Sequence, residues 1–132
     1  MVCKTQTERG DRIRGLLLDK KENMLREIDI DPYDKKEMKK YLHCDFFDAP
    51  QHRIAMRPYR FLVDDNGWPM DEEDADSRIA VVTSFGHPIL YGNVILLAPK
   101  DATLFTDLTD EDIETIKKHV TMLPGMGLVV IL

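Results

Sequence analysis

The alternation of apolar and polar residues near the start of the chain predicts a β-hairpin. Apolar residues cluster at 13–18 and 24–30, on either side of the polar run 19–23, and in the second cluster they alternate with polar residues. A period of two is typical of a strand that buries one face, and a polar run of this length can close a hairpin.

A short helix is predicted to follow the hairpin. Asp31 is suited to the N-cap, Pro32 to the first helical position and Asp34 to the first turn, where the helix dipole favours an anion. The expected apolar stripe consists of Tyr33, Met38, Tyr41 and Leu42. So short a helix depends on the packing of this stripe for its stability.

The remaining apolar runs predict further strands separated by turn residues. They are expected at 45–47, 54–63, 79–82, 89–98 and 128–132. Pro50 marks a turn after the first of these, and Asp65-Asn66-Gly67 marks a turn after the second. Gly92-Asn93 suits a bulge inside the fourth strand.

A second helix is expected to begin at Thr109. Thr109 suits the N-cap, Asp112 occupies the capping-box position, and Leu108 with Ile113 would form a hydrophobic staple. Its buried face is expected to hold Ile113, Ile116 and Val120, and Leu123-Pro124-Gly125 is expected to end it.

These elements predict an α+β fold with a largely antiparallel sheet of five to seven strands and two helices. We expect a single domain over 13–132 and a flexible or edge-lying segment over 1–12. The two cysteines are too few for a disulfide scaffold. No signal segment precedes the domain and no apolar run approaches the length of a membrane span, so we expect a cytoplasmic protein without membrane contact.

The charge of the chain disfavours nucleic acid as a direct partner. The chain has 24 acidic and 18 basic residues, which gives a net charge of −6. Binding to phosphates requires clustered Lys and Arg instead. The acidic residues gather at 64–76 and 107–114, and such charge governs association more than it governs fold.

The acidic stretch at 64–76 is the most distinctive segment, because it also holds the only tryptophan, Trp68, and leads into Arg78. Its spacing does not match a calcium-binding loop. The simplest interpretation is a solvated acidic loop; the alternative is a surface that engages a basic partner, in part by mimicking nucleic-acid charge. The residues expected to bind this partner are Trp68, Asp71, Glu72, Glu73, Asp74, Asp76 and Arg78.

Metal binding and catalysis find little support in the sequence. Four possible metal ligands, His43, Cys44, Asp48 and His52, do not follow a zinc-site spacing, so no metal or other cofactor is expected. His43 directly precedes Cys44, and on a strand the two side chains would point to opposite faces, so His43 is poorly placed to activate the thiol. No nucleotide fingerprint or nucleophile elbow occurs, and we expect no enzyme activity.

Three motifs carry a resemblance to a family: Ser77-Arg78, the strand Ile89-Leu90-Tyr91-Gly92, and the helix start that runs from Phe105 through Leu108-Thr109 to Ile113. Over roughly 14–118 the chain resembles a family of small uncharacterised proteins, a domain of unknown function, found in bacterial phages, plasmids and conjugative elements. The family usually has Asn where this chain has Ser77. The resemblance implies an accessory protein of a mobile genetic element, without a known activity.

We therefore predict a non-enzymatic protein that acts by stoichiometric binding, and hence inhibition, of a host or defence protein with a basic surface. An alternative hypothesis is a small-ligand or nucleotide-binding accessory domain that uses Arg78, Tyr91, Gly92 and Asn93. An enzyme that depends on Cys44 or the carboxylates is a third. The sequence leaves the partner's identity and the oligomeric state open.

Overall fold

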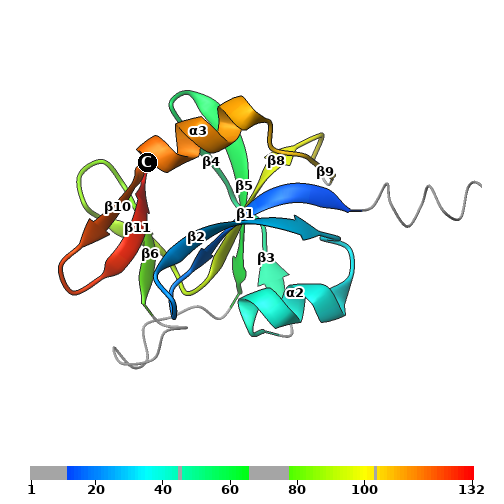
Figure 1. Ribbon diagram of the computed structural model, residues 1–132, viewed down its shortest axis with the longest axis horizontal. Helices are drawn as coiled ribbons and strands as arrows, with labels where there is room; N and C mark the ends of the chain where they lie inside the picture. The colour runs from blue at the N-terminus through cyan, green and yellow to red at the C-terminus, as the bar shows by residue number, and fades with distance from the viewer. Residues whose placement is uncertain (1–11, 45, 66–77, 103) are drawn as a thin grey trace, which may run out of the picture.

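The centre of the protein is an antiparallel seven-stranded sheet (Figure 1). The computed structural model describes residues 12–44, 46–65, 78–102 and 104–132. The strands of this sheet are β1 Ile13–Asp19, β2 Met24–Ile30, β3 Phe47–Asp48, β4 Gln51–Ile54, β5 Arg57–Asp64, β8 Val94–Pro99 and β9 Phe105–Thr106. Their main order is β2-β1-β8-β5-β3, with β4 also paired to β5 and β9 to β8.

A smaller sheet and two helices complete the described part of the chain. The strands of the smaller sheet are β6 Ile79–Val82, β7 Pro88–Tyr91, β10 Val120–Leu123 and β11 Gly127–Ile131, in the order β10-β11-β6-β7. The β11–β6 pair is parallel, and the other two pairs are antiparallel. The helices are α2 Lys35–Leu42 and α3 Asp110–Lys118. The α+β class, the antiparallel main sheet and the two helices are as predicted.

The main sheet is buried on both faces, which is why its inner strands are almost continuously apolar. Leu16 and Leu18 of β1 point into one hydrophobic core, together with residues of α3, β6 and β11. Leu17, between them, points into a second core, which α2 covers with Met38 and Leu42. Figure 1 accordingly shows α3 and α2 on opposite sides of β1 and β2.

The structure confirms the start of the second helix and corrects that of the first. Thr109 and Asp112 form the full capping box of α3. The first helix begins three residues later than predicted, with Asp34 as its N-cap in place of Asp31. The Asp31 side chain accepts instead from the main-chain N–H of Tyr33, and so forms a local turn ahead of the helix.

Three other predicted elements have wrong boundaries, because pairing between distant strands outweighs the local sequence pattern. The expected strand 89–98 is two strands in different sheets, and the chain changes sheets at Gly92 and Asn93. The expected second helix ends at Lys118, because 120–123 pairs with β11 as strand β10. The expected strand 54–63 begins inside a hairpin, since Ile54 ends β4 and Arg57 begins β5.

Candidate binding cleft

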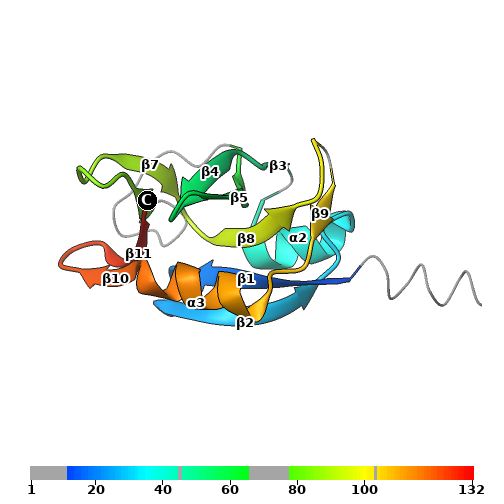
Figure 2. The ribbon, with the colours of Figure 1, turned by 90° about the horizontal axis from the view of Figure 1, so that it is seen from above.

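A cleft of about 450 Å³ opens between the end of β5 and strand β7. Figure 2 shows β7, β4 and β5 along the same side of the molecule. The residues that line the cleft are Asp48, Ala49, Pro50, Val63, Asp64, Asp65, Ile89, Leu90 and Tyr91. They belong to β3 and the turn after it, to the end of β5, and to β7.

The cleft is lined by consecutive residues, which indicates that it lies at the ends and edges of strands and not over one sheet face. Side chains alternate between the two faces of a strand, so a cavity lying over one face meets every second residue. Here the lining residues form the runs 48–50, 63–65 and 89–91. A cleft that meets neighbouring residues in this way reaches the backbone between them.

Carboxylates provide the charge in the cleft. Asp48 and Asp65 are exposed and Asp64 is half-buried, whereas the described lining contains no Lys, Arg or His. The opposite wall is apolar apart from the Tyr91 hydroxyl. Such a surface attracts a cation that carries an apolar stem, because the carboxylate field and the apolar wall then both contribute.

Most of the partner-binding residues predicted from sequence lie outside the described residues. They are Trp68, Asp71, Glu72, Glu73, Asp74 and Asp76. The segment that holds them joins Asp65, at the cleft, to Arg78. In the sequence, these acidic residues begin at Asp71, after the five residues that follow Asp65.

Arg78 lies beside a buried polar cluster. A guanidinium N–H of Arg78 reaches the main-chain carbonyl of Lys20 at 3.5 Å, a long hydrogen bond, and the Arg78 carbonyl accepts from the N–H of Gly92 at 2.7 Å. Asn93 accepts from the Lys20 main-chain N–H and donates to the Tyr41 carbonyl. The structure thus brings Arg78, Gly92 and Asn93 together, but the Asn93 amide is already engaged with the protein.

Lys20 at the centre of this cluster was missed by sequence reasoning. Its ammonium donates to the carbonyls of Met126 and Leu128, and the residue is completely buried. Burial, aided by the nearby Arg78 charge, lowers the pKa of Lys20 to about 8. A lysine in a polar turn gives no sequence signal of burial, because the groups that enclose it are distant in the chain.

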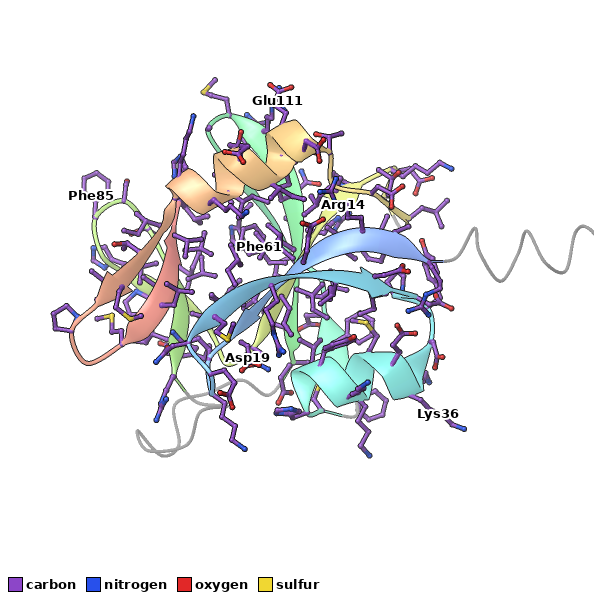
Figure 3. The ribbon with its side chains drawn as sticks, in the orientation of Figure 1. Arg14, Asp19, Lys36, Phe61, Phe85 and Glu111 are labelled. Carbon is purple, nitrogen blue, oxygen red and sulfur yellow. The ribbon has the colours of Figure 1, made fainter. Side chains whose placement is uncertain are left out.

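The acidic run at 107–114 is not the unpaired surface that the sequence suggested. Arg14 pairs with Asp110 at 2.7 Å, and its main-chain N–H donates to Asp107. Figure 3 shows Arg14 between β1 and the helix that carries Glu111. Arg57 pairs with Glu111 at 2.6 Å and with Asp112 at 3.3 Å. Two arginines from the main sheet therefore form ion pairs with three of the five acidic side chains in this run.

The possible metal ligands do not form a site. Among the described residues, no three His, Cys, Asp or Glu side chains come together as a metal ion requires. His43 is the C-cap of α2 in the left-handed conformation, with φ 57°, so the alternation of side chains along a strand does not apply to it. Cys44 follows it, half-buried against the second core.

Comparison with models of known protein families assigns this chain to one of them. A family described as a domain of unknown function, DUF3846, matches residues 13–121. The chain belongs to the DUF3846 family. The predicted resemblance to an uncharacterised family is thus confirmed over nearly the expected residues. No curated protein and no solved structure matches the chain.

The whole cleft lies within the DUF3846 match, whereas two partners of Lys20, Met126 and Leu128, lie beyond its end. The cleft is therefore built from the part of the chain that defines the family. Within the described ranges, no helix is both long and apolar enough to cross a membrane.

Proposed function

We propose that this DUF3846 protein is a non-enzymatic binding protein that holds a basic segment of a partner protein in the cleft between β5 and β7. The observation that carries the proposal is the chemistry of the cleft wall. Asp48 and Asp65 line one part of the cleft, and the apolar residues Ile89 and Leu90 line another. A Lys or Arg side chain matches both walls, with its charge on the carboxylates and its stem on the apolar side.

The net charge and the acidic stretch support the same kind of partner. A chain of net charge −6 attracts a basic surface over long range and speeds its association. The acids at 71–76 add to this attraction by sequence. In the setting that the sequence resemblance implies, a mobile genetic element, the partner is a host or defence protein that is inhibited by stoichiometric binding.

The alternative, a nucleotide or other anionic ligand, receives less support. Phosphate groups bind to cations or free main-chain N–H groups, and in the described cleft any such N–H group lies beside carboxylates that repel a phosphate. Arg78 supplies a cation nearby, but its neighbours Gly92 and Asn93 already hydrogen-bond within the protein. A thermal-shift screen in which a nucleotide stabilises the protein would favour this alternative.

The test is capture of a partner from a bacterial host lysate, followed by affinity measurements with the purified partner. Three variants are compared with the wild type: Asp48→Asn/Asp65→Asn in the cleft, a variant with the acids at 71–76 neutralised, and the control Asp110→Asn/Glu111→Gln. The control removes two charges from side chains that are exposed but already paired with arginines.

We expect the cleft variant to bind the partner about tenfold more weakly and the control to bind within about twofold of wild type. Raising the salt concentration is expected to weaken wild-type binding steeply, because exposed charges are screened. A partner that binds independently of salt, or equally well to the cleft variant, contradicts the proposed function.

A further inference from the structure

Strand β7 is an edge strand, and the cleft lies along it. In the described sheet β7 pairs with β6 alone and stands last in the order β10-β11-β6-β7. The free side of an edge strand presents unpaired N–H and C=O groups that can pair with another chain. Pro88 begins β7 and the N–H of Gly92 is bound to Arg78, so the open part of the edge is confined to 89–91.

The opposite wall of the cleft is also a strand end. β5 pairs with β8 through Arg60, Phe61 and Leu62, and this pairing stops before Asp64. β8 begins only at Val94, because the chain leaves the smaller sheet at Gly92 and Asn93. The ends of β5 and β7 thus diverge around the β7–β8 junction, and the cleft occupies the space between them.

We propose that the basic segment of the partner binds in this cleft as an extended strand, pairing its backbone with the free edge of β7 at Ile89–Tyr91. This inference rests on the proposed function and specifies how the partner is held. Main-chain hydrogen bonds to β7 supply affinity that does not depend on sequence. Side chains on alternate positions of the bound strand then face the exposed carboxylates of Asp48 and Asp65, which select Lys or Arg.

Charge decides between this occupant and two others. A second copy of the chain has the same net charge of −6 and would bring one set of carboxylates against another. A nucleic acid would bring phosphates against them. An extended basic segment is the occupant whose charge complements the cleft.

The test uses short peptides, because it then does not depend on the identity of the natural partner. The probe is an acetylated, amidated hexapeptide in which Lys or Arg alternates with Val. Two matched peptides accompany it: one with Glu in place of each basic residue, and one with the same side chains but N-methyl groups on alternate backbone nitrogens. N-methylation removes the donors needed for strand pairing and leaves the charge unchanged.

Binding is followed by amide NMR of the full-length protein, with hydrogen exchange at 89–91 as the decisive readout. Successive N–H groups of a strand point to opposite sides, so we expect the basic peptide to slow exchange of the amides within 89–91 that point away from β6, by about tenfold or more at saturation. The N-methylated and Glu peptides are expected to give no protection. Asp48→Asn/Asp65→Asn should lower the affinity for the basic peptide by about tenfold. Asp110→Asn/Glu111→Gln should leave that affinity unchanged.

The inference is overturned if the N-methylated peptide binds as well as its parent, or if no basic peptide protects 89–91. It is also overturned if these amides are protected without peptide in a dimer detected by sedimentation, because a second copy then occupies the edge. If a lysate partner still binds in a cleft-dependent and salt-sensitive manner, only the strand-pairing mode fails and the proposed function stands.

Discussion

The ammonium of Lys20 donates a hydrogen bond of 2.9 Å to the main-chain carbonyl of Met126, 106 residues along the chain. It donates a second to the carbonyl of Leu128. The turn after β1 is thereby fixed to the β10–β11 hairpin, and so the main sheet is joined to the smaller one. None of the ion pairs found among the described residues gives Lys20 a carboxylate partner, so carbonyl dipoles compensate its charge.

Lys20 should make the stability of the protein rise in mildly alkaline solution. Its folded-state pKa of about 8 lies below the ordinary 10.5, so between these values the unfolded chain binds more protons than the folded one. The free energy of unfolding therefore increases as the pH rises through this window. Below the window Lys20 is charged in the folded protein, and burial of this charge destabilises the fold to its full extent. Urea unfolding of the wild type and Lys20→Met from pH 7 to about 10.5 measures this.

The difference between the two proteins isolates the lysine, because the other lysines, tyrosines and cysteines titrate in both. We expect the stability of wild type relative to Lys20→Met to increase with pH. A constant difference across the window would show that Lys20 keeps an ordinary pKa in the folded state.

Gly127 lies where the turn after β1 meets the β10–β11 hairpin, and this position tolerates a side chain poorly. Gly127 has φ +75°, and a Cβ built there would overlap the side-chain amide of Asn23. Gly125 has nearly the same φ, +79°, but a Cβ there would meet nothing within 4 Å. Both Gly→Ala variants carry the strain of positive φ, about 1–2 kcal/mol. We expect Gly127→Ala to lose more than this, and the difference in free energy of unfolding from Gly125→Ala to report the overlap.

A second variant identifies the cause of that difference. Asn23→Ala removes the overlapping amide, along with its hydrogen bond to the N–H of Leu128. In a double-mutant cycle, Gly127→Ala should therefore destabilise Asn23→Ala less than it destabilises the wild type. If the two substitutions change the free energy of unfolding additively, the Asn23 side chain moves away from the new Cβ at no cost in stability.

The fold was predictable from sequence wherever its determinants are local. Thr109 and Asp112 specified the start of α3, because a capping box is complete within one helical turn. The β1–β2 hairpin was predicted for the same reason, since its pattern and its turn are contiguous. The short helix predicted after the hairpin is also present, although Asp34 and not Asp31 caps it.

Features that depend on distant pairing could not be predicted. Residues 120–123 continue the pattern of a helix, yet they form β10 because β11 pairs with them. The cleft requires 48–50, 63–65 and 89–91 to meet, and no local signal connects these segments. The pairing of Arg14 and Arg57 with the acids of α3 likewise spans the whole sheet, so charge counted along the chain overstated the acidic surface.

The buried contact between Tyr59 and Asp112 should contribute to stability in a pH-dependent way. The Tyr59 hydroxyl donates to Asp112 at 2.8 Å. Burial alone would raise the pKa of Asp112, but hydrogen bonds from Thr109, Tyr59 and Arg57 outweigh it and lower the pKa below 3.8. The carboxylate thus stabilises the fold above its unfolded-state pKa, and this stability is lost as pH falls through the folded-state pKa.

We expect Tyr59→Phe to cost about 1.5–3 kcal/mol at neutral pH, the range for a hydrogen bond to a charged group. Asp112→Asn should give a shallower loss of stability than wild type as the pH falls below about 4. Urea denaturation between pH 7 and about 2.5 compares the slopes. Parallel curves for wild type and Asp112→Asn would rule out a lowered pKa for this carboxylate.

The β4–β5 hairpin offers a stabilising substitution. Its two turn residues, Ala55 and Met56, have φ 52° and 73°, values that Asn and Gly adopt more readily. Met56 is 84% exposed, so its side chain contributes little packing. We expect Met56→Gly to raise the free energy of unfolding by about 0.5–1 kcal/mol, because relief of the left-handed strain exceeds the added entropy of the unfolded chain.

Met122 supplies a control with the same replacement and the opposite expected sign. It is 57% exposed on strand β10 and does not have positive φ. Met122→Gly therefore relieves no strain; it adds the entropic penalty of glycine in a strand, about 0.5–1 kcal/mol of destabilisation, and also removes a partly buried side chain. Thermal unfolding of both variants tests the assignment. If Met56→Gly destabilises as much as Met122→Gly, the left-handed turn at Ala55 and Met56 does not strain the protein.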